Sequence, residues 1–343
     1  MGEGRTNMNI AVIGIGVIGR RHMDNLKRRG DVDIVAVCGT DEGRTASVAA
    51  EYGAKPYTDY AVMLRRERID ALFVCTPPGV RKEPIREAAE RGIACFVEKP
   101  PARTAEEARD IAAIVRDSGI VCSVGFMYRY TGAVSAARER IRGDGGAVPL
   151  VRSVHVCGAG LPGATTPRWL YDKDRSGGPL FDQGIHLIDA ARYAAGLDVA
   201  DGGEAVGIHA FGSNVQRPRS EEYTVEDNVV VQIAYTSGTL HTHTHSWGVA
   251  DSQAKIELLG SDYRLIVDLT RLGSRLFGTF KGEELDERFP EENMYAAEAD
   301  AFLSAARTGE PSGIRSPYAD AARSLELVVN GGRSLEEGCS LRL

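Results

Sequence analysis

Short apolar runs alternate with segments of helical period over the first 125 residues of the chain. The apolar runs are rich in Val, Ile, Phe and Cys and predict buried strands, while the segments between them predict helices. The expected strands are Ile10–Ile13, Ile34–Cys38, Ala71–Cys75, Ala94–Val97 and Val121–Val124. The expected helices are Gly19–Arg29, Thr45–Glu51, Pro84–Arg91 and Ala105–Ser118. This alternation is typical of an α/β domain with a doubly wound parallel sheet, assigned to residues 1–125.

Beyond residue 126 the strands follow one another directly. The expected strands are Val151–Cys157, Ala205–Phe211, Val229–Tyr235, Leu240–His245, Lys255–Leu259 and Tyr263–Val267. Ser237-Gly238 joins two of them as a tight hairpin, so residues 126–343 are expected to form an α+β domain with a large, mostly antiparallel open sheet. Helices are expected at 133–142, at 179–195 and 295–307 as covers of the sheet, and at about 317–332, packing back on the first domain.

A glycine-rich turn leaves the first expected strand and opens the first expected helix. It reads Gly14-Ile15-Gly16-Val17-Ile18-Gly19. Gly14 permits a tight turn, Gly16 lets the backbone approach a pyrophosphate, and Gly19 allows close packing of the helix. The N–H groups at the helix N-terminus favour an anion. In this context the motif predicts a dinucleotide site, and a turn without a ligand is the less favoured alternative.

The residues after the second expected strand bear on the choice between NAD and NADP. An acidic side chain commonly binds the ribose 2′-hydroxyl of NAD about twenty residues beyond the motif, where this chain has Gly39. Asp41 follows two residues later and suits NAD, whereas Thr40 and Arg44 suit the 2′-phosphate of NADP. The sequence therefore leaves both cofactors open.

A lysine ends the fourth expected strand, in Val97-Glu98-Lys99-Pro100-Pro101. Ligands bind at this edge of open α/β sheets. Pro100 disfavours helical geometry at Lys99 and cannot donate a ladder hydrogen bond, so the strand ends with the lysine extended. Such a lysine can exchange a proton with a substrate hydroxyl and stabilise an alkoxide. A solvated lysine at a strand end is the alternative, and taken alone the commoner case.

Three polar residues lie at helical spacing in an apolar helix that Pro179 is expected to begin. Asp182 and His186 are four residues apart, and Asp189 follows three residues later. Buried carboxylates and imidazoles without partners are costly, so the stripe is predicted to be paired or functional. A hydrogen-bonded Asp–His pair in the core is one alternative; a metal site is less favoured because no third ligand is evident.

Three further histidines, His241, His243 and His245, alternate along one expected strand and share a face. A strand holds such neighbours too far apart for one tetrahedral ion. We therefore expect these histidines on an exposed or subunit-facing surface and expect no metal site.

Composition narrows the classes of function. With 343 residues, 43% of them hydrophobic and 26% charged, the chain can build two folded domains. A formal net charge of −7 without any basic run disfavours nucleic acid as a partner, and no stretch approaches the length of a membrane span. The six cysteines sit singly, with no CxxC, which favours reduced thiols and a cytoplasmic protein.

Four motifs in order along the chain resemble the Gfo/Idh/MocA family, named for glucose-fructose oxidoreductase and inositol dehydrogenase. They are Gly14-x-Gly16-x-x-Gly19, Thr76-Pro77, Glu98-Lys99-Pro100 and Gly177-Gly178-x-x-x-Asp182-x-Gly184-x-His186-x-x-Asp189. The resemblance runs over nearly the whole chain. It implies an N-terminal Rossmann domain, a second domain whose open sheet often forms oligomer interfaces, and NAD(P)-dependent redox of sugars, inositols or sugar nucleotides. Three positions depart from the family pattern, with Gly39 for an acid, Pro78 for Asn and Arg81 for His.

The resemblance also implies that Lys99, Asp182 and His186 carry catalysis and that the Lys99-Pro100 peptide bond can be cis. We expect substrate to bind between the domains, with His186 or Lys99 as the main proton-transfer group and Asp182 fixing the substrate or the imidazole tautomer. Cofactor contacts are expected from Gly14, Gly16, Val17, Ile18, Gly19, Gly39, Thr40, Asp41, Arg44, Thr76, Pro77, Arg81, Glu98 and Lys99. Substrate contacts are expected from Lys99, Tyr128, Arg129, Trp169, Tyr171, Asp182 and His186. For the three aromatic residues of this set, core packing is an equally good explanation.

The expected partners are a carbohydrate-like small molecule and further copies of the chain, as a homodimer or homotetramer. Nucleic acid and membrane are not expected. Two alternatives stay in view: a dinucleotide-bound sensor or regulator without turnover, and a reductase of a non-sugar substrate. Retention of Lys99, Asp182 and His186 together argues against the sensor, because a pure binder needs none of them in that arrangement.

Overall fold

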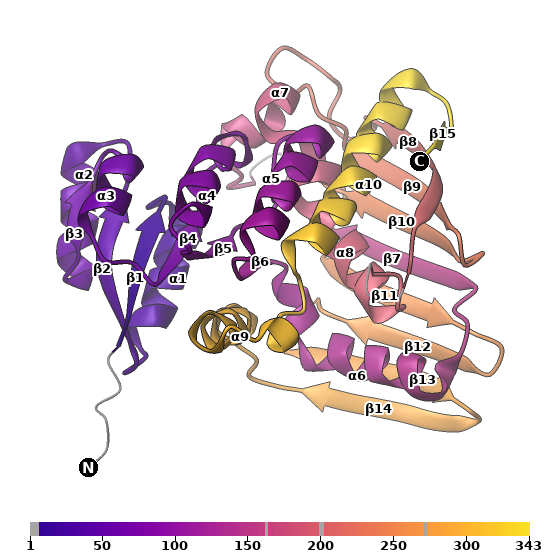
Figure 1. The fold of residues 1–343 in the computed structure, drawn as a ribbon. Helices are drawn as coiled ribbons and strands as arrows, with labels where there is room; N and C mark the ends of the chain where they lie inside the picture. The colour runs from indigo at the N-terminus through magenta and orange to yellow at the C-terminus, as the bar shows by residue number, and fades with distance from the viewer. Residues whose placement is uncertain (1–6, 162–163, 199–201, 271–272) are drawn as a thin grey trace. The chain divides into compact units, whose positions relative to one another are not determined.

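The computed structural model describes residues 7–161, 164–198, 202–270 and 273–343, and the chain forms two compact units (Figure 1). The first unit contains the described residues up to Met127 together with Asn293–Ala322. The second contains the described parts of Tyr128–Glu292 together with Arg323–Leu343.

The first unit is built on a parallel sheet with the strand order β3-β2-β1-β4-β5-β6. The strands are β1 Met8–Ile13, β2 Val32–Cys38, β3 Lys55–Tyr57, β4 Ala71–Val74, β5 Ala94–Val97 and β6 Cys122–Val124. Every residue of β4 and β5 is buried, as expected for central strands covered on both faces. The predicted doubly wound parallel sheet is therefore confirmed, with β3 as an added edge strand. The strand order reverses between β1 and β4, and the edge where both end is the position at which such sheets bind ligands.

Helices connect these strands and cover the sheet. They are α1 Val17–Lys27, α2 Glu42–Tyr52, α3 Tyr60–Arg66, α4 Lys82–Ala89 and α5 Ala105–Ser118. Polar side chains fix where several of them begin: Thr104, for example, accepts the N–H of Glu107 at the start of α5. These caps set the positions at which the loops on the ligand-binding edge turn into helices.

Helix α9, Met294–Thr308, also belongs to the first unit. Its buried residues Ala299, Phe302 and Leu303 join the core cluster of this unit, where the ring of Phe302 meets that of Phe73 edge-on at 5.5 Å. The prediction that this helix covers the antiparallel sheet is wrong. An apolar stripe shows that a helix is covered, but it does not identify the sheet that covers it.

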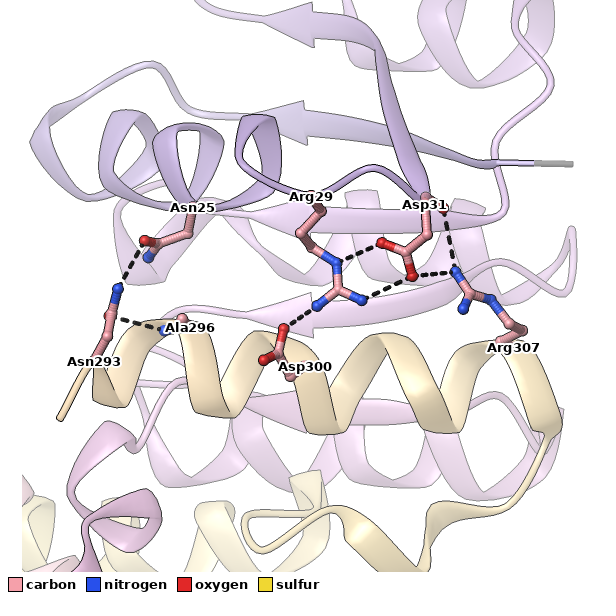
Figure 2. A network of polar contacts seen from close by, with 7 residues as sticks. All are labelled: Asn25, Arg29, Asp31, Asn293, Ala296, Asp300 and Arg307. Carbon is pink, nitrogen blue, oxygen red and sulfur yellow. Dashed lines mark hydrogen bonds and ion pairs between the residues drawn. The ribbon is translucent and has the colours of Figure 1, made fainter. Parts of the chain in front are cut away.

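Polar contacts hold α9 against the start of β2 (Figure 2). Arg29 donates to both carboxylate oxygens of Asp31 at 2.8 Å and also to Asp300 on α9, while Arg307 of α9 donates to Asp31 at 2.8 Å. The hydrogen bonds from Arg29, aided by Arg307, hold the pKa of Asp31 far below its ordinary range. The same view includes Asn25, Asn293 and Ala296, which extend the network along the helix.

The second unit carries a larger sheet with the order β14-β13-β12-β11-β7-β10-β9-β8-β15. Its strands are β7 Leu150–Val156, β8 Ala205–Ser213, β9 Asn228–Tyr235, β10 Leu240–Ser246, β11 Gln253–Leu259, β12 Tyr263–Asp268, β13 Ser274–Phe280, β14 Glu283–Phe289 and β15 Leu341–Arg342. Among the described strands of this sheet, β7 and β10 alone pair in parallel, so the predicted mostly antiparallel sheet is confirmed. Strands β13, β14 and β15 were not expected. Strand β14 lacks an apolar pattern because it is an edge strand whose residues are mostly charged and none of which is buried.

Helices cover one face of this sheet. Helix α6, Gly132–Arg140, packs on β12 to β14, and α8, Ile185–Ala194, packs on β7 and β11. The later part of α10, Tyr318–Glu337, reaches β8 and β9, since the backbone of Gly331 lies against the side chains of Ile208 and Val231. Helix α10 begins in the first unit, where the hydroxyl of Tyr318 donates to the carbonyl of Pro101 at 3.1 Å. Two short elements precede α8: α7, Lys173–Ser176, and a π-helical turn, Leu180–Gly184.

None of the helices within the described ranges combines the length and the apolar character needed to cross a membrane.

Candidate active site

The glycine-rich turn of the first unit has the geometry of a pyrophosphate cradle. Gly14 has a φ of +99°, and a Cβ on it would lie 2.5 Å from the carbonyl oxygen of Cys75. A Cβ on Gly19 would lie 1.9 Å from the carbonyl oxygen of Gly14, whereas one on Gly16 would meet no atom within 4 Å. Gly14 and Gly19 are therefore required by the fold itself, and Gly16 opens the space next to the N-terminus of α1. A dinucleotide phosphate fits this arrangement.

The end of β2 leaves no room for the acidic side chain that often binds the adenosine ribose. A Cβ on Gly39 would lie 2.6 Å from Oγ1 of Thr45 and 2.9 Å from Cδ1 of Ile15. The carboxylate of Asp41 caps α2 by accepting the N–H of Arg44 at 2.7 Å. Thr40 precedes this cap and Arg44 lies in the first turn of α2, and both side chains are exposed.

Lys99 follows β5 at the same edge of the sheet, and its peptide bond to Pro100 is cis, as the family resemblance implied. Its backbone is held from two sides. The carboxylate of Glu98 accepts the N–H of Lys99 at 3.0 Å, and the guanidinium of Arg81 donates to the carbonyls of Glu98 and Pro100. Arg81 also donates to the carbonyl of Thr76, the residue before Pro77, at 2.5 Å and is only 2% exposed. Arg81 and Glu98 thus fix the loop that carries Lys99.

His186 and Asp182 lie in the second unit, where the π-helical turn runs into α8. The turn follows Gly177 and Gly178, both at positive φ, and replaces the regular α-helix expected from Pro179 onward. His186 lies in the first turn of α8, is 8% exposed, and has its ring against that of Tyr128 at 5.6 Å. Asp182 lies in the π-helical turn and is partly exposed. The imidazole of His186 and the ring of Tyr128 are therefore in contact within this unit.

The residue between Asp182 and Gly184 ties this turn to the sheet. Gln183 accepts a hydrogen bond from Nε1 of Trp247 at 2.7 Å and one from Sγ of Cys157 at 3.3 Å. Burial raises the pKa of the Cys157 thiol, and the charge of Asp182 raises it further, which places that carboxylate near the end of β7. Sequence reasoning missed Gln183, Trp247 and Cys157, because side chains that meet across a sheet leave no signal in spacing along the chain.

The remaining candidates for substrate contacts differ in their surroundings. Trp169 is 43% exposed. Tyr171 packs in a cluster with Tyr223 and Trp247, and its hydroxyl donates to the carbonyl of Ala159 at 2.8 Å. Arg129 is fully buried and is ion-paired with Asp189. Arg129 and Tyr171 therefore belong to the interior of the second unit.

The three histidines of β10 are buried, so the prediction of an exposed or subunit-facing surface is wrong. His241, His243 and His245 are at most 1% exposed, on the face of the sheet that the helices cover. Ser153 of β7 bridges His241 and His243 through hydrogen bonds of 2.8 Å. A Cβ on Gly184 would lie 3.3 Å from Nε2 of His243, so the glycine lets the turn close onto the histidines. Burial lowers the pKa of all three imidazoles.

Two family models match most of the chain. A model described as an oxidoreductase family with an NAD-binding Rossmann fold matches residues 8–126, and the GFO/IDH/MocA C-terminal domain matches residues 134–266.

Individual proteins match over two thirds of the chain or more. The scyllo-inositol 2-dehydrogenase (NAD(+)) of Bacillus subtilis (strain 168) is 27% identical, covering 97% of this chain and 95% of that protein. The D-glucoside 3-dehydrogenase of Escherichia coli (strain K12) is 30% identical, covering 67% of this chain and 68% of that protein. The solved structure of levoglucosan dehydrogenase with NADH and L-sorbose matches with a TM-score of 0.84 at 21% identity, covering 98% and 99% of the two chains, which shows a shared fold.

Proposed function

Since this chain belongs to the GFO/IDH/MocA family and is an NAD(P)-dependent oxidoreductase, we propose that it oxidises a secondary alcohol, or reduces the matching ketone, of a sugar, inositol, aminosugar or sugar nucleotide. One observation carries this proposal most strongly. Lys99 is fixed at the carboxyl edge of the sheet that also presents the open cradle at Gly16. A cation at that edge lies where ligands of doubly wound sheets bind.

Proton transfer, charge stabilisation and substrate orientation are assigned to Lys99, His186 and Asp182. A dinucleotide held at this cradle would supply the hydride acceptor for oxidation and the hydride donor for reduction. His186 takes the hydroxyl proton in oxidation and returns it in reduction, or Lys99 does so in its place. The ammonium group of Lys99 stabilises the charge that develops on the substrate oxygen. Asp182 orients the substrate or keeps the imidazole in one tautomer.

The other residues divide into direct and indirect roles. Gly14, Gly16 and the first residues of α1, Val17 and Ile18, hold the pyrophosphate, while Gly19 closes the turn beneath it. Gly39, Thr40, Asp41 and Arg44 surround the adenosine ribose of NAD or NADP, and Thr76 and Pro77 meet the nicotinamide half. Tyr128 and Trp169 contact substrate. Four residues act indirectly, by fixing the residues that contact cofactor or substrate: Arg81, Glu98, Arg129 and Tyr171.

We further propose a homodimer or homotetramer that works in the cytoplasm. Among the described parts of the second unit, the sheet face opposite α6 and α8 carries a hollow of about 510 Å³, lined in part by Val154, Ile266 and Phe277. The lining also includes charged and hydroxyl side chains, among them Arg152, Lys255 and Glu257. An open sheet face of this kind suits association with a second copy. All six cysteines are free thiols, which suits a reducing compartment. Light scattering that finds only monomer at working concentration contradicts the oligomer.

A substrate screen tests the main proposal. Purified protein is mixed with NAD or NADP and with sugars, inositols, aminosugars and sugar nucleotides, and the absorbance of the reduced nicotinamide is followed. We expect turnover with at least one member of these classes. Binding of dinucleotide without turnover of any compound identifies a sensor instead, and turnover only of non-carbohydrate carbonyls identifies a different reductase.

A further inference from the structure

Three ionisable side chains meet behind Lys99 in the interior of the first unit. His22 comes from α1, Glu98 follows β5, and Glu298 comes from α9. They are 0%, 5% and 0% exposed, and one nitrogen or oxygen atom of each lies within 4.8 Å of the others. Charged groups are rarely buried this completely unless each has a partner.

Glu98 is the member of this cluster with evident partners. A hydrogen bond of 2.7 Å joins its Oε1 to Nε2 of His22, and its Oε2 accepts the backbone N–H of Lys99 at 3.0 Å. Gly125 makes room for the carboxylate, because a Cβ there would lie 3.1 Å from Oε1. Although burial acts in the opposite direction, the hydrogen bond and charge of His22, with Lys99 and Arg81, keep the pKa of Glu98 below its ordinary value.

Glu298 lies in contrasting surroundings. Within the described part of the chain, neither of its carboxyl oxygens has a hydrogen-bond partner. Phe302 follows one turn later on α9 and meets the ring of Phe96, which in turn lies 4.9 Å from the ring of His22. Burial, and the nearby charge of Glu98, raise the pKa of Glu298 well above its ordinary value. Two carboxylates that share one dry site cannot both ionise without a large cost.

We propose that this cluster carries one carboxylate, Glu98, which positions Lys99 through its backbone N–H, and that Glu298 is kept as a neutral carboxylic acid. In this arrangement Glu98 is a positioning residue, because it acts on the substrate only through Lys99. Glu298 leaves the cluster with a single negative charge, so that the attraction of Glu98 for His22 and for the N–H of Lys99 is not opposed by a second anion. The positioning role rests on the function proposed above, whereas the protonation of Glu298 does not.

The surrounding charges favour this division. The groups that face the two carboxyls are His22 from α1, Cys75 after β4, Arg81 before α4, Lys99, and Tyr295 on α9. The cations Arg81 and Lys99 lie on the side of Glu98. Arg21 lies over the ring of Tyr295 at 4.7 Å. Stabilisation by cations is therefore concentrated on Glu98.

A divalent metal ion is the competing occupant, since the three groups satisfy its distance requirement. The observations favour a proton on Glu298 over a bound metal ion. Both oxygens of Glu98 already have hydrogen-bond partners, Nε2 of His22 and the N–H of Lys99. A closed structural zinc site takes four protein ligands, whereas this cluster of described residues offers three. The aromatic rings of Phe96 and Phe302 supply no further ligand.

The first experiment tests the neutral state of Glu298 in the full-length protein without substrate. An infrared difference spectrum between wild type and Glu298→Gln is expected to show the carbonyl band of a protonated carboxyl group, shifted in heavy water and absent from the variant. Because Gln has the shape of the neutral acid, the melting temperature should change by only about 2 °C. Absence of the band, or a metal ion bound one-to-one in wild type and lost in Glu298→Gln, overturns the proposal.

The second experiment tests the positioning role through a double-mutant cycle in kcat. Glu98→Gln should lower kcat at least about tenfold, while changing the Kd of the dinucleotide less than about twofold. In a Lys99→Ala background the same change should have little further effect, because a residue that acts through Lys99 has nothing left to position. Glu98→Asp, which keeps the charge, replaces Glu98→Gln if that variant does not fold. Additive losses in kcat overturn the positioning role. If no substrate is found, the proposed function fails together with the positioning role, whereas the infrared experiment, which needs no substrate, still decides the protonation of Glu298.

Discussion

The guanidinium of Arg129 binds the carboxylate of Asp189 through two hydrogen bonds, from Nε to Oδ2 at 2.8 Å and from Nη2 to Oδ1 at 2.5 Å. The two side chains are 0% and 1% exposed, and Ser324 donates a further bond of 2.6 Å to Asp189. Arg129 directly follows Tyr128, and Asp189 lies one turn after His186 on α8. This pair therefore fixes the tyrosine and the histidine relative to each other.

Removing one side of this pair should unfold the second unit at a much lower urea concentration. We expect Asp189→Ala to cost about 3–5 kcal/mol, because it leaves a buried guanidinium without its partner. Both tryptophans of the chain, Trp169 and Trp247, lie in this unit, so their fluorescence follows its unfolding. Arg333→Ala, in an exposed ion pair, serves as control and should cost at most about 1 kcal/mol. Equal losses in the two variants would contradict the structural role of the pair.

Lys99 and His186 should each be needed for turnover but not for binding of the dinucleotide. We expect Lys99→Ala and His186→Ala to lower kcat on the order of 10²-fold or more, because each removes a group that holds or moves the substrate proton. The Kd of NAD or NADP, measured by titration, should change little. Lys27→Ala, which removes an exposed lysine at the end of α1, is the control and should keep wild-type kcat. Near-normal kcat in both active-site variants rejects the assignment.

The buried histidines of β10 should make the second unit sensitive to acid. Burial lowers the pKa of His241 from its ordinary value of 6.5 to about 3, and it lowers those of His243 and His245 as well. Below pH 6.5 the unfolded chain therefore binds more protons than the folded one, so stability falls with pH from 6.5 downward. Each histidine adds up to about 1.4 kcal/mol per pH unit to this slope.

A histidine variant and a control variant without a titratable group check this slope. His245→Phe should reduce the loss of unfolding free energy between pH 7 and about pH 5, because the variant has one group fewer to protonate. Thr244→Ala, at an exposed threonine of β10 that does not titrate, should leave the slope as in wild type. A slope that is the same in all three proteins would show that the β10 histidines are not kept neutral by burial.

An acidic residue placed at position 39, where many NAD-binding proteins have one, should not improve the binding of NAD. Gly39→Asp is expected to weaken the binding of both NAD and NADP, because its Cβ would overlap Thr45 and Ile15. Thr40→Asp places the acid one residue later on an exposed position, where it should repel the 2′-phosphate and raise the preference for NAD. The ratio of the two dissociation constants measures both effects. A Gly39→Asp variant with tighter NAD binding would contradict the steric argument.

Helix α9 should stabilise the parallel sheet of the first unit. We expect Phe302→Ala to cost about 3–5 kcal/mol in that unit, because its ring fills the core beside Phe73 and Phe96. Hydrogen exchange should accelerate in β1, β4 and β5 and remain slow in β9 and β10. Faster exchange in the antiparallel sheet alone would assign the helix to the other unit.

The local sequence pattern was enough to predict the parts of the fold that depend on residues close together along the chain. Alternation of apolar runs with helical segments predicted the parallel sheet. The glycines of the first turn predicted the phosphate cradle, in which Gly14 and Gly19 have no room for a Cβ. The Glu98-Lys99-Pro100 motif predicted a lysine at the strand end and, through the family resemblance, the cis bond. These features follow from backbone sterics and from side chains a few residues apart, which the order of residues specifies directly.

Contacts between distant segments were decided only by tertiary structure. The sequence showed that 295–307 forms an amphipathic helix, but packing determined which sheet it covers. It showed that the histidines of β10 share a face, but the position of α8 determined that this face is buried. It singled out Asp189 as a polar residue in an apolar helix without naming Arg129 as its partner. Periodicity specifies which side of an element is covered, whereas the identity of the cover depends on the free energy of packing the whole chain.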